Sequence, residues 1–301
     1  MHSARLRSRE GNWIASLNIY RRIISENPKF SPAHCELARL YIDRDDFCGA
    51  RTLVENVLAV EKDNSEASFL LGVIEYVEGN FDASLRAYRT VEKKDGLDVN
   101  LAMNIALVCE SLGLYRDAIK HLEYAIARGE PNIKIFEVLA DLFRSVGEYD
   151  NEERVLENAL NKFPGEASLH FNLGLARLKL GNFLKSEVSF KTANRLVPDD
   201  PGPLDELVRL YVRSGRVGEA ILQLHRLIEI DSDNAQNRLR LARAHHSLGE
   251  SEKTLQVLEE AARIFPGNAS IIKELDYTRR LLENRKDGRE ASGGEKPETE
   301  Q

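Results

Sequence analysis

The sequence has little of what marks several classes of protein. It holds three cysteines, an odd number that includes no Cys-x-x-Cys pair, so a disulfide framework and a structural zinc site are both disfavoured. Nine prolines and 19 glycines among 301 residues are too few for a low-complexity chain. No apolar run approaches the roughly 20 residues that a membrane-spanning helix needs. We therefore expect no membrane span and a reducing compartment.

The N-terminus and the charge balance narrow the class further. The first residues, MHSARLRSREGNW, are basic but are not followed by the apolar stretch of a signal peptide, which predicts a cytoplasmic protein. Whether the native N-terminus lies upstream of Met1 stays open, and an upstream segment would weaken that prediction. The net charge of −7 and the pI of about 5.7 disfavour DNA and RNA as partners, because dedicated nucleic-acid binders are usually basic.

Motifs that carry catalysis are also lacking. The chain has no phosphate-binding Gly-x-x-x-x-Gly-Lys-Ser/Thr or Gly-x-Gly-x-x-Gly loop, no His-Glu-x-x-His and no Gly-x-Ser-x-Gly. The adjacent His245 and His246 would point about 100° apart on a helix and would not converge on one metal. His245 is therefore predicted to be a core or interface residue. We expect no enzyme activity, no cofactor and no metal site.

What the sequence does contain is a strict period. Six glycines, each 34 residues after the last, mark it: Gly79, Gly113, Gly147, Gly181, Gly215 and Gly249. Gly11 lies in the same phase, and only Asp45 interrupts the series. A period of this length is typical of a stack of supersecondary units in which each unit contacts its neighbours.

Each repeat is numbered here from 1 to 34, counting from Ser31, and is named by its first residue. Apolar or small residues recur at positions 4, 7, 8 and 11, and again at 17, 20, 24 and 27, which is the spacing of one face of an α-helix. The glycine at position 15 lies between these two stripes. The pattern predicts two helices of about 14 residues per repeat, joined by a turn in which glycine adopts a left-handed conformation.

Three further features recur along the repeats. Small residues predominate at positions 8 and 20, where the paired helices are expected to approach closely. Position 17 is aromatic six times in succession: Trp13, Phe47, Phe81, Tyr115, Tyr149 and Phe183. Position 32 is proline in several repeats, where it ends the second helix: Pro28, Pro164, Pro198 and Pro266.

These positions resemble the tetratricopeptide repeat (TPR). The Ala167 repeat matches in many places: Leu173-Gly174, Gly181-Asn182-Phe183, Ser186, Phe190, Ala193 and Pro198. The resemblance covers roughly residues 1–284, with seven repeats in register, and implies an all-α fold, a right-handed superhelical α-solenoid of stacked helix-turn-helix units. Glu75 and Arg177 depart from it at the usually aromatic position 11. Glu152 departs from it at the small position 20 and is expected to loosen its repeat.

The period divides the chain into an array with two irregular ends. Residues 1–30 hold a partial N-terminal repeat, and residues 31–268 hold seven repeats: 31–64, 65–98, 99–132, 133–166, 167–200, 201–234 and 235–268. A capping helix is predicted for 269–284, with Asn268 as its N-cap and a polar outer face. The run 285–301 has no large apolar residue and is predicted to be a disordered tail.

In TPR proteins, positions 2, 5, 6, 9, 12 and 13 of the first helices line a concave groove, and the resemblance implies such a surface here. One predicted part of it is an apolar patch: Phe69, Leu70, Val73, Tyr76, Met103 and Leu107. The helix-pair stripe does not require these residues, and an exposed apolar patch is typical of a site for an extended peptide or an amphipathic helix. The alternative is that positions 5 and 9 pack against the neighbouring first helix.

The second predicted part of the groove is basic: Arg209, Arg213, Arg240 and Arg243. Guanidinium groups suit a carboxylate or a phosphate, whereas the alternative is a solvated face balanced by Asp205 and Glu206. Three more residues complete the predicted groove: Phe171 and the position-6 asparagines Asn104 and Asn172, whose amides suit the backbone of a ligand. The residues of the co-chaperone carboxylate clamp are lacking, so a chaperone C-terminal tail is not the expected ligand.

The sequence therefore predicts a non-enzymatic scaffold that binds a peptide or a helix of a protein partner in its groove. The alternative is an accessory or regulatory subunit of a larger enzyme system, such as a glycosyltransferase or a secretion or assembly apparatus. RNA binding through the arginines is less favoured. The partner's identity, the pathway and any self-association stay open.

Overall fold

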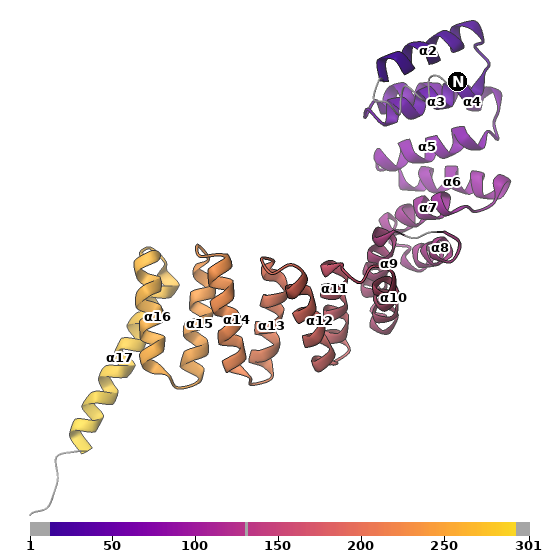
Figure 1. Ribbon diagram of the computed structural model, residues 1–301. Coiled ribbons are helices and arrows are strands. Elements are labelled where there is room, and N and C mark those ends of the chain that lie inside the picture. Colours follow the sequence, from indigo (N-terminus) through magenta and orange to yellow (C-terminus); the bar gives the residue numbers. More distant parts are fainter. Residues whose placement is uncertain (1–12, 130–131, 293–301) are drawn as a thin grey trace, which may run out of the picture. The chain divides into compact units, whose positions relative to one another are not determined.

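The chain folds as a series of helix pairs (Figure 1). The computed structural model describes residues 13–129 and 132–292, and in these ranges every regular element is an α-helix and none is a strand. No helix there has the length and apolar character needed to cross a membrane. The start of the predicted partial repeat and the end of the predicted tail lie outside the described residues.

Helix starts recur with the 34-residue period. The first helices of the pairs are α3 (Ser31–Ile42), α5 (Ser65–Val77), α7 (Val99–Ser111), α9 (Ile133–Ser145), α11 (Ala167–Lys179), α13 (Pro201–Arg213) and α15 (Ala235–Ser247). The second helices are α2 (Trp13–Glu26), α4 (Phe47–Val60), α6 (Phe81–Asp95), α8 (Tyr115–Arg128), α10 (Tyr149–Lys162), α12 (Phe183–Leu196), α14 (Val217–Ile230) and α16 (Ser251–Ile264). Helix α17 (Ala269–Ser292) comes last. The predicted all-α fold of paired helices is confirmed.

Two compact bodies make up the chain, and each is described by itself. The N-terminal body is Met1–Val155 and the C-terminal body is Leu156–Gln301. Large side chains of their cores are fully buried: Tyr20, Tyr88 and Phe136 in the first body, and Tyr211, Phe190 and Leu169 in the second. Each such side chain contributes about 1.5–3 kcal/mol through removal of its apolar surface from water.

The turns between paired helices explain both the glycines and the single interruption. All six periodic glycines have positive φ, between 72° at Gly113 and 81° at Gly79. Asp45 has φ 60° and is the one non-glycine residue with positive φ among those described. Aspartate tolerates this conformation better than most residues. The turn is therefore the same at Asp45 as elsewhere, at a small conformational cost.

The small residue at position 8 faces the side chain at position 24 of the same pair. A methyl group added to Gly72 would lie 2.5 Å from the ring of Tyr88, and one added to Gly174 would lie 2.5 Å from the ring of Phe190. In the same two pairs the position-20 serine donates to the glycine carbonyl, at 2.6 Å from Ser84 and 2.8 Å from Ser186. Glycine at position 8 thus makes room for an aromatic ring at position 24.

The charged residues at position 11 are paired across the junctions between repeats. Arg51 of α4 donates to Glu75 at 2.7 Å and to Glu78 at 2.6 Å. The hydrogen bond from Arg51 lowers the pKa of Glu75 although the carboxyl is buried. At another junction the signs are reversed, because Arg177 donates to Glu157 of α10 at 2.7 Å. Both departures from the repeat pattern are therefore compensated by the preceding second helix.

Glu152 lies inside its helix pair with no exposed surface. Its Oε1 accepts hydrogen bonds from Arg144, from Nε at 2.8 Å and from Nη2 at 2.5 Å, while no partner for Oε2 is found among the described residues. Burial raises the pKa of Glu152, and Arg144 offsets this only in part. The side chain that departs from the small-residue pattern is thus accommodated by a neighbouring arginine.

The last helix is longer than the predicted capping helix. We expected it to end at Asn284 and a disordered tail to follow, but the helical backbone of α17 continues to Ser292. Lysine, arginine, glutamate and alanine occur between 285 and 292, and these residue types lose little side-chain freedom in a helix. The absence of large apolar residues therefore did not locate the end of the helix.

Candidate partner-binding site

The predicted apolar patch of the N-terminal body is largely packed into its own helix pair. Leu70 is only 2% exposed and belongs to the core, so its prediction as an exposed groove residue is wrong. The ring of Phe69 lies 5.5 Å from that of Tyr88, and the ring of Tyr76 lies 5.6 Å from that of Phe81. Much of this patch thus contributes to the packing of α5 on α6.

The rest of that patch offers a narrow surface. Val73 and Met103 are half-buried, and Leu107 is exposed. The Asn104 amide donates to the carbonyl of Asn100 at 2.8 Å and accepts a long contact from Tyr88 Oη at 3.4 Å. Its polar atoms are already engaged within the protein.

Two predicted groove residues of α11 are partly buried as well. Phe171 lies 5.7 Å from the ring of Phe190, which repeats the arrangement of Phe69 on Tyr88. Asn172 is half-buried and has contacts within the protein. The histidine prediction is confirmed, because His245 is buried with its Nδ1 2.6 Å from Glu250 Oε2.

The four predicted arginines come together around one cavity of the C-terminal body. We call it the arginine pocket; its volume is about 450 Å³. Its lining comes from α13, α14 and α15: Val208, Arg209, Val212, Arg213, Val217, Leu224, Arg240, Arg243, Ala244 and Ser247. The floor is mostly aliphatic and the basic groups surround it, so the pocket combines an apolar surface with cationic hydrogen-bond donors.

Three of the four arginines already have carboxylate partners. Arg209 pairs with Glu206 at 2.6 Å and Arg240 with Asp205 at 2.5 Å. This agrees with the alternative prediction, in which Asp205 and Glu206 balance the charge of the arginines. Arg243 Nε donates at 2.7 Å to Glu274 Oε1 of α17, a partner that the sequence reasoning missed. Contacts between α15 and the last helix could not be assigned from the spacing of residues within a repeat.

Arg213 differs from the other three. Its guanidinium lies 5.5 Å from the centre of the Phe183 ring, in the range of a cation–π contact. No carboxylate of the described residues lies within ion-pair distance of it. Arg213 is also exposed, so it is the arginine of the pocket that has most capacity left for an anionic ligand.

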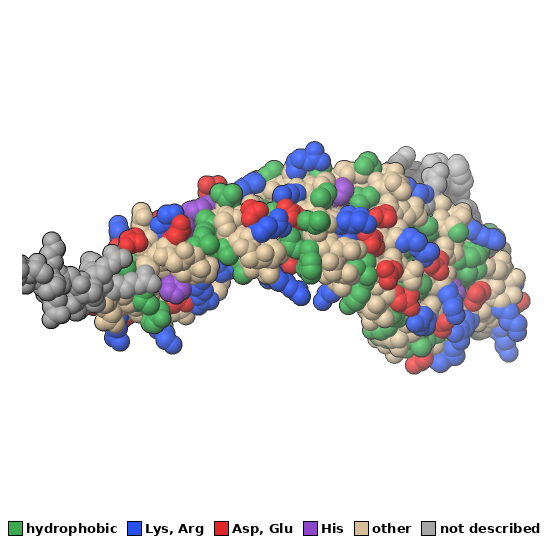
Figure 2. Space-filling view, turned by 90° about the horizontal axis from the view of Figure 1, so that it is seen from below, with side chains coloured by type: hydrophobic (Ala, Val, Ile, Leu, Met, Phe, Trp, Pro, Cys, Tyr) green, Lys and Arg blue, Asp and Glu red, His purple; other side chains and the backbone are tan. Residues whose placement is uncertain are grey.

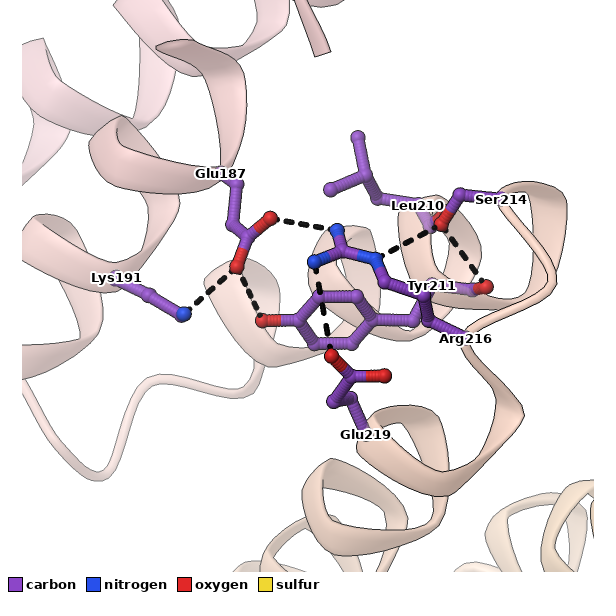
Figure 3. Close-up of polar contacts among 7 residues, drawn as sticks. All are labelled: Glu187, Lys191, Leu210, Tyr211, Ser214, Arg216 and Glu219. Carbon is purple, nitrogen blue, oxygen red and sulfur yellow. Dashed lines mark hydrogen bonds and ion pairs between the residues drawn. The ribbon is translucent and has the colours of Figure 1, made fainter. Parts of the chain in front are cut away.

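A polar network holds the turn that carries one wall of the pocket (Figure 3). Glu187 of α12 accepts hydrogen bonds from Tyr211 Oη at 3.0 Å and from Arg216 Nη2 at 2.6 Å. Lys191 donates to the same carboxylate at 2.7 Å. Burial alone would raise the pKa of Glu187, but these three donors outweigh it and lower the pKa to about 2. The network fixes Arg216, and with it the start of α14 at Val217.

On the face drawn in Figure 2, acidic and basic side chains are interspersed. The arginine pocket itself follows this pattern, since three of its cations pair with carboxylates of the same body. A surface of this kind suits a ligand that carries a few negative charges. A long polyanion instead requires a continuous basic stripe.

Paired helices in a constant 34-residue phase, each turn closed by a left-handed residue, define a helical repeat protein. The family model of the tetratricopeptide repeat matches residues 35–84, 75–133, 138–201 and 206–269, well over half of the sequence. The chain belongs to the tetratricopeptide repeat family.

One curated relative shows how much of a longer protein this chain matches. Superkiller protein 3 of Schizosaccharomyces pombe is 28% identical over 199 residues, which cover 62% of this chain and 14% of that protein. This chain therefore spans a small fraction of the length of that relative, and the activity and partners of the whole relative do not transfer to it.

Solved structures share the fold. The C-terminal part of a TPR protein from Cytophaga hutchinsonii superposes with a TM-score of 0.67 at 14% identity, covering 80% of this chain and 98% of that one. YrrB, a TPR protein with an unusual peptide-binding site, superposes with a TM-score of 0.56 at 16% identity, covering 62% of this chain and 96% of that one. At these identities the likeness establishes the fold alone.

Proposed function

We propose that this chain is a non-catalytic scaffold that binds a segment of a partner protein at the arginine pocket. Membership of the TPR family supports a role in protein–protein interaction. The observation that carries the location is the arginine pocket, where four arginines surround an aliphatic floor. Its volume of about 450 Å³ lies in the range of roughly 300–1,000 Å³ that is common for ligand pockets.

The chemistry of the lining favours an acidic segment that also carries an apolar side chain. The lining residues Val212 and Val217 offer apolar surface that gains free energy when a ligand side chain covers it. Arg213 offers a fork of donors that has no carboxylate partner among the described residues, and such a fork suits a carboxylate. An acidic residue next to an apolar one satisfies both parts of the pocket.

The N-terminal surface around Leu107 is the weaker candidate. Leu70 is buried there, and Phe69 and Tyr76 are packed on rings of their own helix pair. Substituting Phe69 by aspartate would therefore disturb the helix pair itself. A clean test of function belongs at the arginine pocket, where Val212 is 52% exposed.

The test is selection of a displayed library of random short peptides against the purified protein, followed by binding measurements on the selected peptides. We expect acidic sequences with an apolar residue to be enriched. A variant with both Val212→Asp and Arg213→Glu should lose at least tenfold in affinity, because the floor becomes polar and the free donor becomes an acceptor. In the matched control, Leu184→Asp changes a residue of α12 that is 78% exposed and does not line the pocket.

Two outcomes would contradict the proposal. One is that the double variant binds the selected peptides as tightly as the wild type while its circular dichroism is unchanged. The other is that Leu184→Asp loses as much affinity as the double variant, which would move the site away from the pocket.

A further inference from the structure

The arginine pocket lies in the repeat where position 17 is no longer aromatic. In the Ala167 repeat, position 17 is Phe183, and Arg213 of the next repeat lies 5.5 Å from its ring. In the Ser65 repeat, position 17 is Phe81, whose ring packs on Tyr76. In the Pro201 repeat, position 17 is Val217, and Val217 lines the pocket. The aromatic series that began at Trp13 thus ends at the pocket.

Two neighbouring positions shrink together with position 17. Position 12 is Leu178 in the Ala167 repeat and Val212 in the Pro201 repeat. Position 13 of the following repeat is Arg213 in the first case and Ser247 in the second. Val212, Val217 and Ser247 all line the pocket. Other lining residues are larger than their equivalents one repeat earlier, such as Arg209 in place of Leu175, but Val212, Val217 and Ser247 are all smaller than theirs. These three reductions provide the space of the pocket.

We infer that the arginine pocket receives an aromatic side chain of the partner segment, in the space that the repeat's own position-17 ring occupies elsewhere, with an acidic residue of the same segment bound by Arg213. This inference rests on the proposed function and specifies the ligand of the same pocket. The ring of the partner would take the place of the aromatic side chain that position 17 of this repeat lacks.

An aromatic side chain fits the pocket better than an aliphatic one. Arginines surround the pocket, and a guanidinium gains additional attraction from the face of a ring. Among its described residues, the same body uses this contact three times: Arg213 over Phe183 at 5.5 Å, Arg216 over Tyr211 at 4.6 Å and Arg238 over Phe265 at 5.6 Å. Aromatic residues also supply large contact area with few rotatable bonds, so little entropy is lost on binding.

The experiment uses synthetic fluorescent peptides in which acidic residues flank one central Trp, Phe, Leu or Ala, measured by fluorescence anisotropy with the full chain. We expect the Trp and Phe peptides to bind at least tenfold more tightly than the Ala peptide, with Leu between them. Val217→Phe should weaken the Trp and Phe peptides at least tenfold, because the chain's own ring then fills the space. Val217→Ile, which adds a single methylene, is the matched control and should bind within about threefold of the wild type.

The inference and the proposed function fail in different ways. If no acidic peptide binds, or if Arg213→Glu leaves binding unchanged, the proposed site itself is wrong. If acidic peptides bind and require Arg213, but the Ala peptide binds as tightly as the Trp peptide, only the aromatic inference is overturned. Unchanged binding of the Trp peptide by a folded Val217→Phe protein overturns it as well. Circular dichroism and thermal unfolding identify a variant that fails to fold, and in that case the comparison of peptides on the wild type decides.

Discussion

The Ala167 and Pro201 repeats are neighbours in the C-terminal body and have helices of equal length, yet they place side-chain volume differently. Inside the first pair, Gly174 faces Phe190; inside the second, the equivalent residues are Val208 and Leu224. The larger ring goes with the smaller partner, so a change at one position is offset, at least in part, by a change at the other. A core packed at crystal-like density requires such compensation.

Around the arginine pocket the same two repeats differ in another way. Phe183 is replaced by Val217, and two further lining residues, Val212 and Ser247, are smaller than their equivalents Leu178 and Arg213. Volume is thus conserved where a void would cost stability and released where a void can hold a ligand. Under the proposed function, the first kind of residue serves folding and the second serves recognition.

The largest effect is expected from enlarging position 8 of the Ala167 repeat without reducing the ring at position 24. Gly174→Val gives position 8 the residue of the next repeat, but a Cβ there lies 2.5 Å from the ring of Phe190. We expect a loss of about 3 kcal/mol in unfolding free energy, since overpacking forces the helices apart. Urea unfolding followed by circular dichroism measures it. Adding Phe190→Leu should restore most of the loss, and a single variant as stable as the wild type would contradict the volume rule.

A second prediction concerns the link between the two repeats. Glu187 has a pKa of about 2 in the folded protein, below the ordinary value of 4.5, so its stabilisation is complete above pH 4.5 and is lost as the pH falls toward 2. The loss should be on the order of 2 kcal/mol. Glu187→Gln should flatten this part of the stability profile in chemical unfolding.

The control for that experiment is Glu219→Gln. Glu219 is about half exposed and lies 3.7 Å from Arg216, outside hydrogen-bond distance, so its removal should leave the acid slope almost unchanged. Equal slopes for Glu187→Gln and the wild type would show that the network carries no pH-dependent stability.

The smallest effect is expected from making the Ala167 repeat resemble its neighbour at position 17. Phe183 is 43% exposed, so Phe183→Val should cost only about 1 kcal/mol in thermal unfolding. The substitution also releases Arg213 from its cation–π contact, worth roughly 0.5–1 kcal/mol. Acidic peptides should then bind about threefold more tightly at the arginine pocket. Weaker binding would mean that the ring holds Arg213 in its binding position.

Much of the fold followed from periodic positions, because each depends on local geometry. The glycine turns, the small residues at position 8 and the helix starts all recur every 34 residues, and Asp45 shows that the turn persists without glycine. The four arginines were also predicted to lie together, since positions 9 and 13 of one repeat and 6 and 9 of the next share a face. Their meeting around an apolar floor was not predicted.

What could not be predicted depends on contacts between elements. Leu70 was expected on the surface, but it belongs to a core cluster shared with Ala38 and Val54 of the preceding repeat, and no spacing within one helix reveals that. Phe69 lies against Tyr88 because Gly72 brings the two helices close. The shortage of volume at Val217 was visible as the end of an aromatic series, but its meaning depends on the size of neighbours from two other helices.

The charged junctions have a consequence for how the array assembles. Arg51 meets Glu75 at one junction, whereas Glu157 meets Arg177 at another, so the two junctions have opposite polarity. If the Ser65 repeat packed on α10 in a misfolded chain, Glu75 would face Glu153, which holds the repeat position of Arg51, and the two like charges would repel each other in a partly buried setting. Repeats of similar shape are thereby made non-interchangeable. The charges at each junction match only the correct neighbouring repeat. This disfavours pairing of similar repeats in the wrong order.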